Sequence, residues 1–487
     1  MAVPARTMHK PPIALQCPNP ECLAANSDGR PFCAKCGTFV PQRYLLAAGE
    51  SIALKPGEML AGRYYYHGDG IFLDAQPGLL PQLPDEVPEF IEPYLRLFPE
   101  RVRVPQAYGF ASDKGMTVWF LEKAPIVADA NGVRWRPSLQ ESWAGATPLR
   151  QLHWLWQMAR LWTPMRATGV ASSLLDDRLL RVEGGLLRLL RLEFDRTPPT
   201  LAQLGEFWQL WVPGARTEIA EFLDRLCQNL RSGDIGSPEA LVTALDRALT
   251  LYGRTQSYKI QIATQTDRGP SRVRNEDACY PEPGSRRTYS NNALGIVCDG
   301  VGGHEGGDVA SKTAIEVIER GLSQYQFSGE MLAQGSLVPA IEAAILESNR
   351  AISDRNNSEQ RQGRQRMGTT LVMSLIHGHE TYIAHVGDSR AYLIGSDNCY
   401  QITLDDDVAS RDVRLGYALY RDALQNYSAG SLVQALGMGP SNTLHPTVER
   451  FILDGDCVFL LCSDGLSDRD RVEQYWRSDI LPVLEDK

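Results

Sequence analysis

The chain has few cysteines and no long apolar run. Ten cysteines occur among 487 residues, which excludes a small fold stapled by disulfides. The run Val458–Cys462 is typical of the longest apolar stretches, far below the roughly 18 residues that predict a membrane span. Residues 1–16 contain no apolar segment of the kind that signal peptides carry. We therefore expect a cytoplasmic protein that does not interact with membranes.

A surplus of positive charge is also lacking. Lys and Arg number 49 against 59 Asp and Glu, which gives a net charge of −10. This balance argues against a nucleic-acid-binding protein, because such proteins present a basic surface to the phosphate backbone. Hydrophobic residues make 43% and charged residues 22%, which are ordinary values for a folded protein. The length predicts two to four domains.

Four of the ten cysteines lie close together near the N-terminus, at Cys17, Cys22, Cys33 and Cys36. Their spacing resembles that of zinc ribbons, and four thiolates suit a closed tetrahedral site of structural zinc. We predict a zinc ribbon in residues 1–43 that folds only with its metal. Two disulfides, or four reduced cysteines without metal, are the alternatives. The weak local charge does not favour nucleic acid, so we expect a protein partner for the ribbon.

Residues 44–255 hold most of the tryptophan. Eight of the nine tryptophans lie between Trp119 and Trp211, and we interpret them as core residues of a separate α+β domain. Thr117–Leu121 alternates like a strand, and the apolar residues from Leu152 to Trp162 recur at helical spacing.

The order of elements in this domain resembles that of a protein kinase. Val102–Phe110 and Val118–Glu122 would form the strand pair before the hinge, and Asp176–Leu190 would correspond to the region around the catalytic loop. The His-Arg-Asp and Asp-Phe-Gly motifs of active kinases are absent. Without a metal-binding aspartate and a base, phosphoryl transfer lacks its electrostatic parts. We predict an inactive kinase-like module, with an unrelated α/β domain as the alternative.

The last part of the chain places acidic residues directly after short apolar strands. Carboxylates in this position gather at one edge of a sheet, and hard oxygen ligands suit Mg²⁺ or Mn²⁺. Two such ions can activate a water molecule for attack on phosphorus. The motifs, in chain order, are Arg272-Val-Arg-Asn275-Glu276-Asp277, Asp299-Gly300, Gly368-Thr369-Thr370, Gly387-Asp388-Ser389-Arg390 and Ser463-Asp464-Gly465.

Together these motifs resemble the bacterial, metal-dependent type 2C (PPM) serine/threonine protein phosphatases, over about Tyr258 to Asp468. The resemblance implies a phosphatase domain over residues 256–487, built as a β-sandwich flanked by helices (α-β-β-α). It implies hydrolysis of phosphoserine and phosphothreonine on proteins by a water that two divalent ions activate, Mn²⁺ or Mg²⁺. Asp388 would serve a third ion.

The resemblance also assigns roles to individual residues. Arg272 would bind the substrate phosphate, and Asp299 would bridge the two metal ions at the catalytic centre. The full set of implied metal ligands is Glu276, Asp277, Asp299, Gly300, Asp388 and Asp464.

Two places depart from the family pattern. Val301 stands where some members carry a histidine that acts as general acid, and we interpret the nearby His304 as a loop residue. The family ends with a strand opened by an Asp-Asn pair, and the 23 residues after Asp464 contain no such strand. Asp479 precedes Ile480-Leu-Pro482, where the proline disfavours a central strand. The alternative function is therefore a non-catalytic regulatory or scaffold protein with a degenerate phosphatase domain.

One acidic run, Asp405-Asp406-Asp407, falls between predicted elements. Most runs of this kind are solvated turns, and we predict the same here, without a metal ion.

Overall fold

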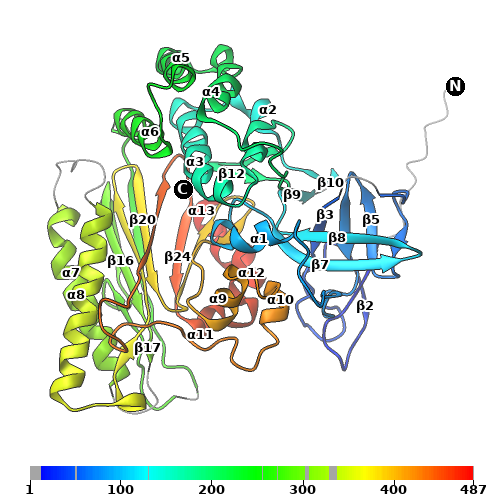
Figure 1. The fold of residues 1–487 in the computed structure, drawn as a ribbon. Coiled ribbons are helices and arrows are strands. Elements are labelled where there is room, and N and C mark those ends of the chain that lie inside the picture. The colour runs from blue at the N-terminus through cyan, green and yellow to red at the C-terminus, as the bar shows by residue number, and fades with distance from the viewer. Residues whose placement is uncertain are drawn as a thin grey trace.

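A computed structural model gives the architecture of most of the chain (Figure 1). Within it no helix is both long and apolar enough to cross a membrane. The structure describes residues 13–49, 52–129, 131–254, 256–270, 272–301, 306–327 and 337–485.

The cysteine-rich start of the chain forms a short antiparallel hairpin. Strand β1 (Ala14–Gln16) pairs with β2 (Ala25–Ser27). Its small core contains Leu15 and Val40, and it is continuous with Leu73 of the following sheet. The hairpin therefore shares its apolar core with residues 44–255.

The first large sheet has six strands in the order β4-β5-β6-β3-β8-β7. Aromatic side chains fill its core, with the rings of Tyr64 and Phe120 4.4 Å apart. Strand β8 contains the predicted Thr117–Leu121. Strand β7 begins after Pro105 and not at Val102, because proline lacks the amide hydrogen that a strand donates. The strands are β3 (Tyr44–Ala47), β4 (Met59–Leu60), β5 (Tyr64–Gly68), β6 (Ile71–Asp74), β7 (Gln106–Asp113) and β8 (Met116–Glu122).

A group of helices and two hairpins follows this sheet. Helix α3 (Pro148–Ala167) is capped by the Thr147 hydroxyl, which accepts a hydrogen bond from the backbone N of Arg150 at 3.2 Å. Trp143, Trp154, Trp156, Trp162, Trp208 and Trp211 are buried, which confirms that most of these tryptophans form a core, whereas Trp119 is partly exposed and Trp135 is exposed. The other elements are α1 (Glu92–Arg96), β9 (Ile126–Asp129), β10 (Gly132–Trp135), α2 (Leu139–Trp143), β11 (Leu180–Glu183), β12 (Leu186–Leu189), α4 (Leu201–Gln209), α5 (Thr217–Ser232) and α6 (Pro238–Gly253).

Two antiparallel sheets face each other in the last part of the chain. The larger has the order β14-β16-β19-β20-β23, and its outer face is covered by α7 (Gly307–Phe327) and α8 (Leu337–Ser358) (Figure 1). The smaller has the order β22-β21-β24, and Phe459 and Leu461 pack from it against Phe451 of the larger sheet. The strands are β14 (Ala278–Tyr280), β16 (Asn292–Cys298), β19 (Leu371–His377), β20 (Glu380–Val386), β21 (Arg390–Ile394), β22 (Cys399–Gln401), β23 (Thr447–Ile452) and β24 (Val458–Cys462).

Helices also cover the outer face of the smaller sheet. Val472 in α12 (Arg471–Tyr475) and Trp476 after it pack against Tyr392 and Ile394 of β21. The described residues after Asp464, up to position 485, form short helices and contain no strand, as expected from the sequence. The layers therefore follow the expected order of helices, two sheets and helices. Strand β13 (Lys259–Ala263) pairs separately with β15 (Arg286–Ser290).

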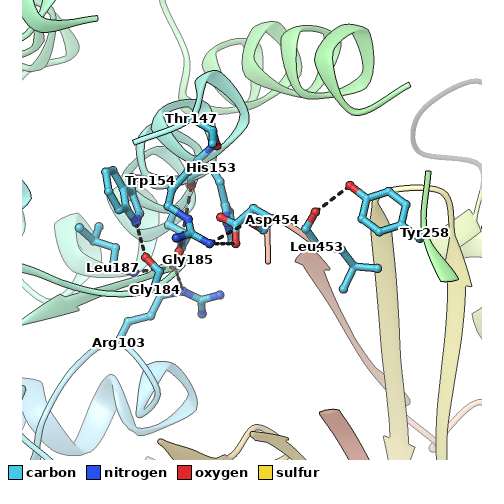
Figure 2. Close-up of polar contacts among 12 residues, drawn as sticks. Arg103, Thr147, His153, Trp154, Gly184, Gly185, Leu187, Tyr258, Leu453 and Asp454 are labelled. Atoms are coloured by element: carbon cyan, nitrogen blue, oxygen red, sulfur yellow. Dashed lines mark hydrogen bonds and ion pairs between the residues drawn. The ribbon is translucent and has the colours of Figure 1, made fainter. Parts of the chain in front are cut away.

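Residues 44–255 pack tightly against the facing sheets. Asp454, in the turn between β23 and β24, accepts hydrogen bonds from Arg150 and His153 of α3, both at 2.9 Å (Figure 2). A Cβ at Gly185, in the hairpin β11–β12, would lie 2.5 Å from Oδ1 of Asp454. Only a residue without a side chain fits there, so the hairpin and the turn are in direct contact.

Candidate metal and phosphate site

Three of the predicted metal ligands meet at one end of the facing sheets. Asp299 follows β16, Asp464 follows β24 at the start of α11 (Asp464–Ser467), and Asp277 precedes β14. The Asp299 carboxyl lies within hydrogen-bonding reach of both Asp277 and Asp464. Burial, together with these two negative neighbours, raises the pKa of Asp299 to about 8. Among the residues that the structure describes, no ion pair involves these three carboxylates, and converging carboxylates of this kind fit a divalent cation.

Hydrogen bonds to the neighbouring chain hold Asp299 in place. Its backbone N donates to Oγ1 of Thr370 at 3.1 Å, and its carbonyl accepts from the backbone N of Thr370 at 2.8 Å. The hydroxyl of Thr369 donates to the same carbonyl at 2.9 Å. The predicted Gly-Thr-Thr motif therefore supports the ligand-bearing loop and does not itself supply a carboxylate.

Gly300 and Glu276 lie against the start of α7. A Cβ at Gly300 would lie 2.5 Å from the carbonyl carbon of Gly307, so this close backbone packing requires glycine. The Ser311 hydroxyl donates to the carbonyl of Glu276 at 2.8 Å. The Glu276 carboxylate reaches the same place, because a Cβ at Gly307 would lie 3.0 Å from its Oε1. The structure therefore places Glu276 beside Gly300 at the N-terminal end of α7.

Asp388 occupies the loop between β20 and β21. Gly387 before it has a φ of +98°, and a Cβ there would lie 2.9 Å from Cγ2 of Thr370. Burial raises the pKa of Asp388 to about 6, with smaller contributions from the charges of Asp405 and Asp464. The interaction with Asp464 brings this loop to the same end of the sheets as Asp299.

The prediction that Asp405-Asp406-Asp407 is a solvated turn is wrong. The three side chains are only 4%, 5% and 6% exposed. Asp405 accepts two or more hydrogen bonds from Arg390, the shortest at 2.7 Å, and Asp407 caps α9 (Val408–Arg414) by accepting from the backbone N of Ser410 at 2.7 Å. The signal in the sequence was Arg390 of the Gly387-Asp388-Ser389-Arg390 motif, since a partly buried guanidinium needs a carboxylate partner.

Arg272 is the residue predicted to bind phosphate. It lies in the exposed loop between β13 and β14, and within the described residues no hydrogen bond or ion pair joins it to Asp299, Asp277 or Asp464. Val301 ends the two-residue strand β17 (Gly300–Val301), whereas His304 lies outside the described residues.

The four N-terminal cysteines form a second cluster. Their Sγ atoms all lie within 4.8 Å of one another, with 3.6 Å between Cys17 and Cys36 and 3.8 Å between Cys22 and Cys33. All four are free thiols. Hydrogen bonding with Thr38 lowers the pKa of Cys36 to about 6, whereas burial raises that of Cys17 to about 12. The convergence of four sulfur atoms fits a tetrahedral zinc ion.

Facing sheets with carboxylates gathered at one end define a phosphatase domain of the type that the motifs predicted. A sequence profile described as Protein phosphatase 2C matches residues 268–485. The serine/threonine phosphatase stp of Listeria monocytogenes is 32% identical over 204 residues, which are 42% of this chain and 77% of that protein. The chain therefore belongs to the protein phosphatase 2C family.

Two further comparisons involve Mycobacterium tuberculosis. Its serine/threonine protein phosphatase PstP is 32% identical over 209 residues, which cover 43% of this chain and 37% of PstP. A crystal structure of PstP covers 47% of this chain and 91% of the solved chain at 28% identity, with a TM-score of 0.35. The profile match begins at residue 268, so it does not include residues 13–255.

Proposed function

We propose that the chain hydrolyses phosphoserine and phosphothreonine on protein substrates with the help of divalent metal ions. The observation that carries this proposal is the convergence of Asp277 and Asp464 on Asp299. Carboxylates so close together, in a partly buried place, lack the positive charge that would stabilise them. A cation supplies that charge. The same cluster argues against the non-catalytic scaffold alternative, which has no use for it.

The residues present fit two ions, Mn²⁺ or Mg²⁺. Asp299 would bridge them, with Asp277, Asp464, Glu276 and the Gly300 carbonyl as further ligands. Metal ions held there supply Lewis-acid chemistry and lower the pKa of a water molecule, which makes it a nucleophile near neutral pH. The Thr369 and Thr370 bonds hold the backbone of Asp299 in place. Asp388 would serve a third ion.

We assign phosphate binding to Arg272. Its exposed position in the β13–β14 loop leaves the guanidinium open to a phosphate on a protein surface. A guanidinium binds two phosphate oxygens at once, which orients the phosphorus as well as holding it.

The other segments complete the proposal. We propose that Cys17, Cys22, Cys33 and Cys36 bind structural Zn²⁺ in a ribbon of residues 1–43, which contacts a protein partner. Residues 44–255 form an α+β domain, interpreted as an inactive kinase-like module, and residues 256–487 form the phosphatase domain. We propose that the protein acts in the cytoplasm.

The test is hydrolysis of a phosphothreonine peptide and of an aryl phosphate with Mn²⁺ supplied. Asp299→Asn should lower the rate at least 100-fold, because it removes the bridging carboxylate; effects of this size follow the loss of a metal ligand or its support. Asp354→Asn, at an exposed position of α8, is the matched control and should keep full activity. Equal rates for the wild type and Asp299→Asn on both substrates would refute the proposal.

A further inference from the structure

One segment of the chain contacts the Asp388 loop on both sides of Asp388, through hydrogen bonds and an ion pair. Oδ2 of Asp406 accepts from the backbone N of Gly387 at 3.0 Å, and the backbone N of Asp406 donates to the Gly387 carbonyl at 2.9 Å. Asp405 binds the guanidinium of Arg390, two residues after Asp388. We call residues 403–433 the bracing segment, because its first residues fix the chain immediately before and after Asp388.

The opposite side of the bracing segment is held by residues 44–255. The guanidinium of Arg101 donates to the carbonyl of Thr403, two residues before Asp405. Further along, Glu122 at the end of β8 forms an ion pair with Arg421 at 2.6 Å. The rings of Phe98 and Tyr420 lie 5.2 Å apart. Polar and aromatic contacts therefore attach the segment at its start and near its middle.

The apolar residues of the bracing segment are also buried against residues 44–255. Ala409 and Val413 of α9, and Leu419 and Ala423 around α10 (Tyr420–Ala423), belong to the core cluster of residues 44–255. They do not belong to the cluster that joins the larger sheet to α7 and α8. The position of the segment is therefore set by the domain that precedes the phosphatase sheets.

We propose that residues 44–255 position Asp388 through the bracing segment, with Arg101 and Glu122 as positioning residues. This inference rests on the proposed function, in which Asp388 serves a metal ion. A kinase-like domain without kinase motifs then has a mechanical role in the phosphatase reaction. Any partner or modification that shifts it would change the affinity of the Asp388 site for its ion.

The first experiment needs no metal ion and no turnover. Hydrogen–deuterium exchange of the full chain, without added Mn²⁺, reports directly on how firmly residues 386–391 are held. Arg101→Ala should increase exchange in residues 386–391 and in the bracing segment. Arg101→Lys keeps a donor for the Thr403 carbonyl and should restore most of the protection. Arg96→Ala, an exposed arginine of α1, is the matched control and should leave both regions unchanged.

The second experiment measures the consequence for the ion. Mn²⁺ binding followed by calorimetry should show one class of sites weakened about fivefold in Arg101→Ala, an effect of the size of typical couplings between contacting residues. The Mn²⁺ concentration for half-maximal hydrolysis should rise with it, whereas KM for an aryl phosphate should stay the same. A purely structural defect would instead lower the fraction of active protein without changing the Mn²⁺ affinity or the Mn²⁺ concentration for half-maximal hydrolysis.

Variants of a second contact, the ion pair of Glu122 and Arg421, keep the test informative if Arg101→Ala fails to fold. Glu122→Gln removes charge at nearly constant volume, and Arg421→Gln removes the partner charge together with its contact with the Tyr108 ring. Each should weaken the same Mn²⁺ site, whereas the double variant should be no worse than Arg421→Gln. Folded variants with wild-type exchange and wild-type Mn²⁺ binding would overturn the inference while leaving the proposed function intact. A wild-type chain that hydrolyses nothing would overturn the proposed function, and the exchange experiment would still decide the positioning.

Discussion

The carboxylate of Asp454 lies 2.9 Å from Nδ1 of His153, although 301 residues separate them in the chain (Figure 2). Arg150 binds the other carboxylate oxygen and the Asp454 carbonyl. Burial opposes ionisation of Asp454, but the hydrogen bonds and charges of His153 and Arg150 lower its pKa to about 2. Tyr258 fixes the same turn by donating to the Leu453 carbonyl at 2.8 Å. This network joins α3 to the turn that leads into β24 and Asp464.

Replacing Asp454 with asparagine should destabilise the protein by about 3 kcal/mol at pH 7, because it leaves Arg150 and His153 without their buried anion. The folded pKa lies below the unfolded value of 3.8, so the stabilisation is full above about pH 4 and is lost as the pH falls towards 2. Scanning calorimetry between pH 3 and pH 7 checks both points. An Asp454→Asn variant with the wild-type melting temperature at pH 7 would contradict the prediction.

Asp299 should show the opposite pH dependence in protein without added Mn²⁺ or Mg²⁺. Its folded pKa of about 8 lies above the unfolded value of 3.8, so the folded state binds more protons between these values and loses stability as the pH rises. Asp299→Asn lacks this loss of stability. The difference in melting temperature between the variant and the wild type should therefore be several degrees larger at pH 8 than at pH 5. Each kcal/mol corresponds to about 2–4 °C. Parallel melting profiles for the two proteins would rule out the raised pKa.

Cys33→Ser should remove zinc from the purified protein, because three thiolates hold a structural ion much less tightly than four. Metal analysis should fall from about one zinc per chain to well below one. Cys227→Ser, at a buried cysteine of α5 outside the cluster, is the control and should keep the metal. Unchanged zinc in Cys33→Ser would mean that the four sulfur atoms are not the site.

Asp405→Asn should cost about 3 kcal/mol, because it leaves the guanidinium of Arg390 without its buried partner. Asp412→Asn breaks the more exposed pair with Arg411 and should cost less than about 1 kcal/mol. Urea unfolding of both variants gives the comparison. Equal midpoints would show that burial of the acidic run contributes nothing to stability.

Arg272→Ala should raise KM for a phosphopeptide about tenfold without changing the melting temperature, since the side chain is exposed and its role is phosphate binding. Arg268→Ala, in the same loop, is the matched control. Steady-state kinetics with Mn²⁺ checks the prediction, and a KM that both variants leave at the wild-type value would remove Arg272 from the site.

The proximity of Asp299 and Asp464 could be predicted because each residue belongs to a short local pattern. Asp299 and Asp464 each follow an apolar strand directly, so strand recognition alone brings them to one end of the facing sheets. The burial of Asp405 and the contacts of Asp454 depend instead on which distant elements meet. Position 454 contacts position 153 only because α3 packs across the sheet edge, and periodicity along the chain contains no information about that docking.

Gly185 lies at the contact between the β11–β12 hairpin and the β23–β24 turn. A methyl group there would overlap the Asp454 carboxylate at 2.5 Å, so the Gly185 backbone packs directly against that side chain. Gly185→Ala would therefore add one methyl group at this contact, which separates the domains without deleting a charge. This variant would test whether the phosphatase sheets remain active when residues 44–255 are still covalently linked to them but no longer packed against them.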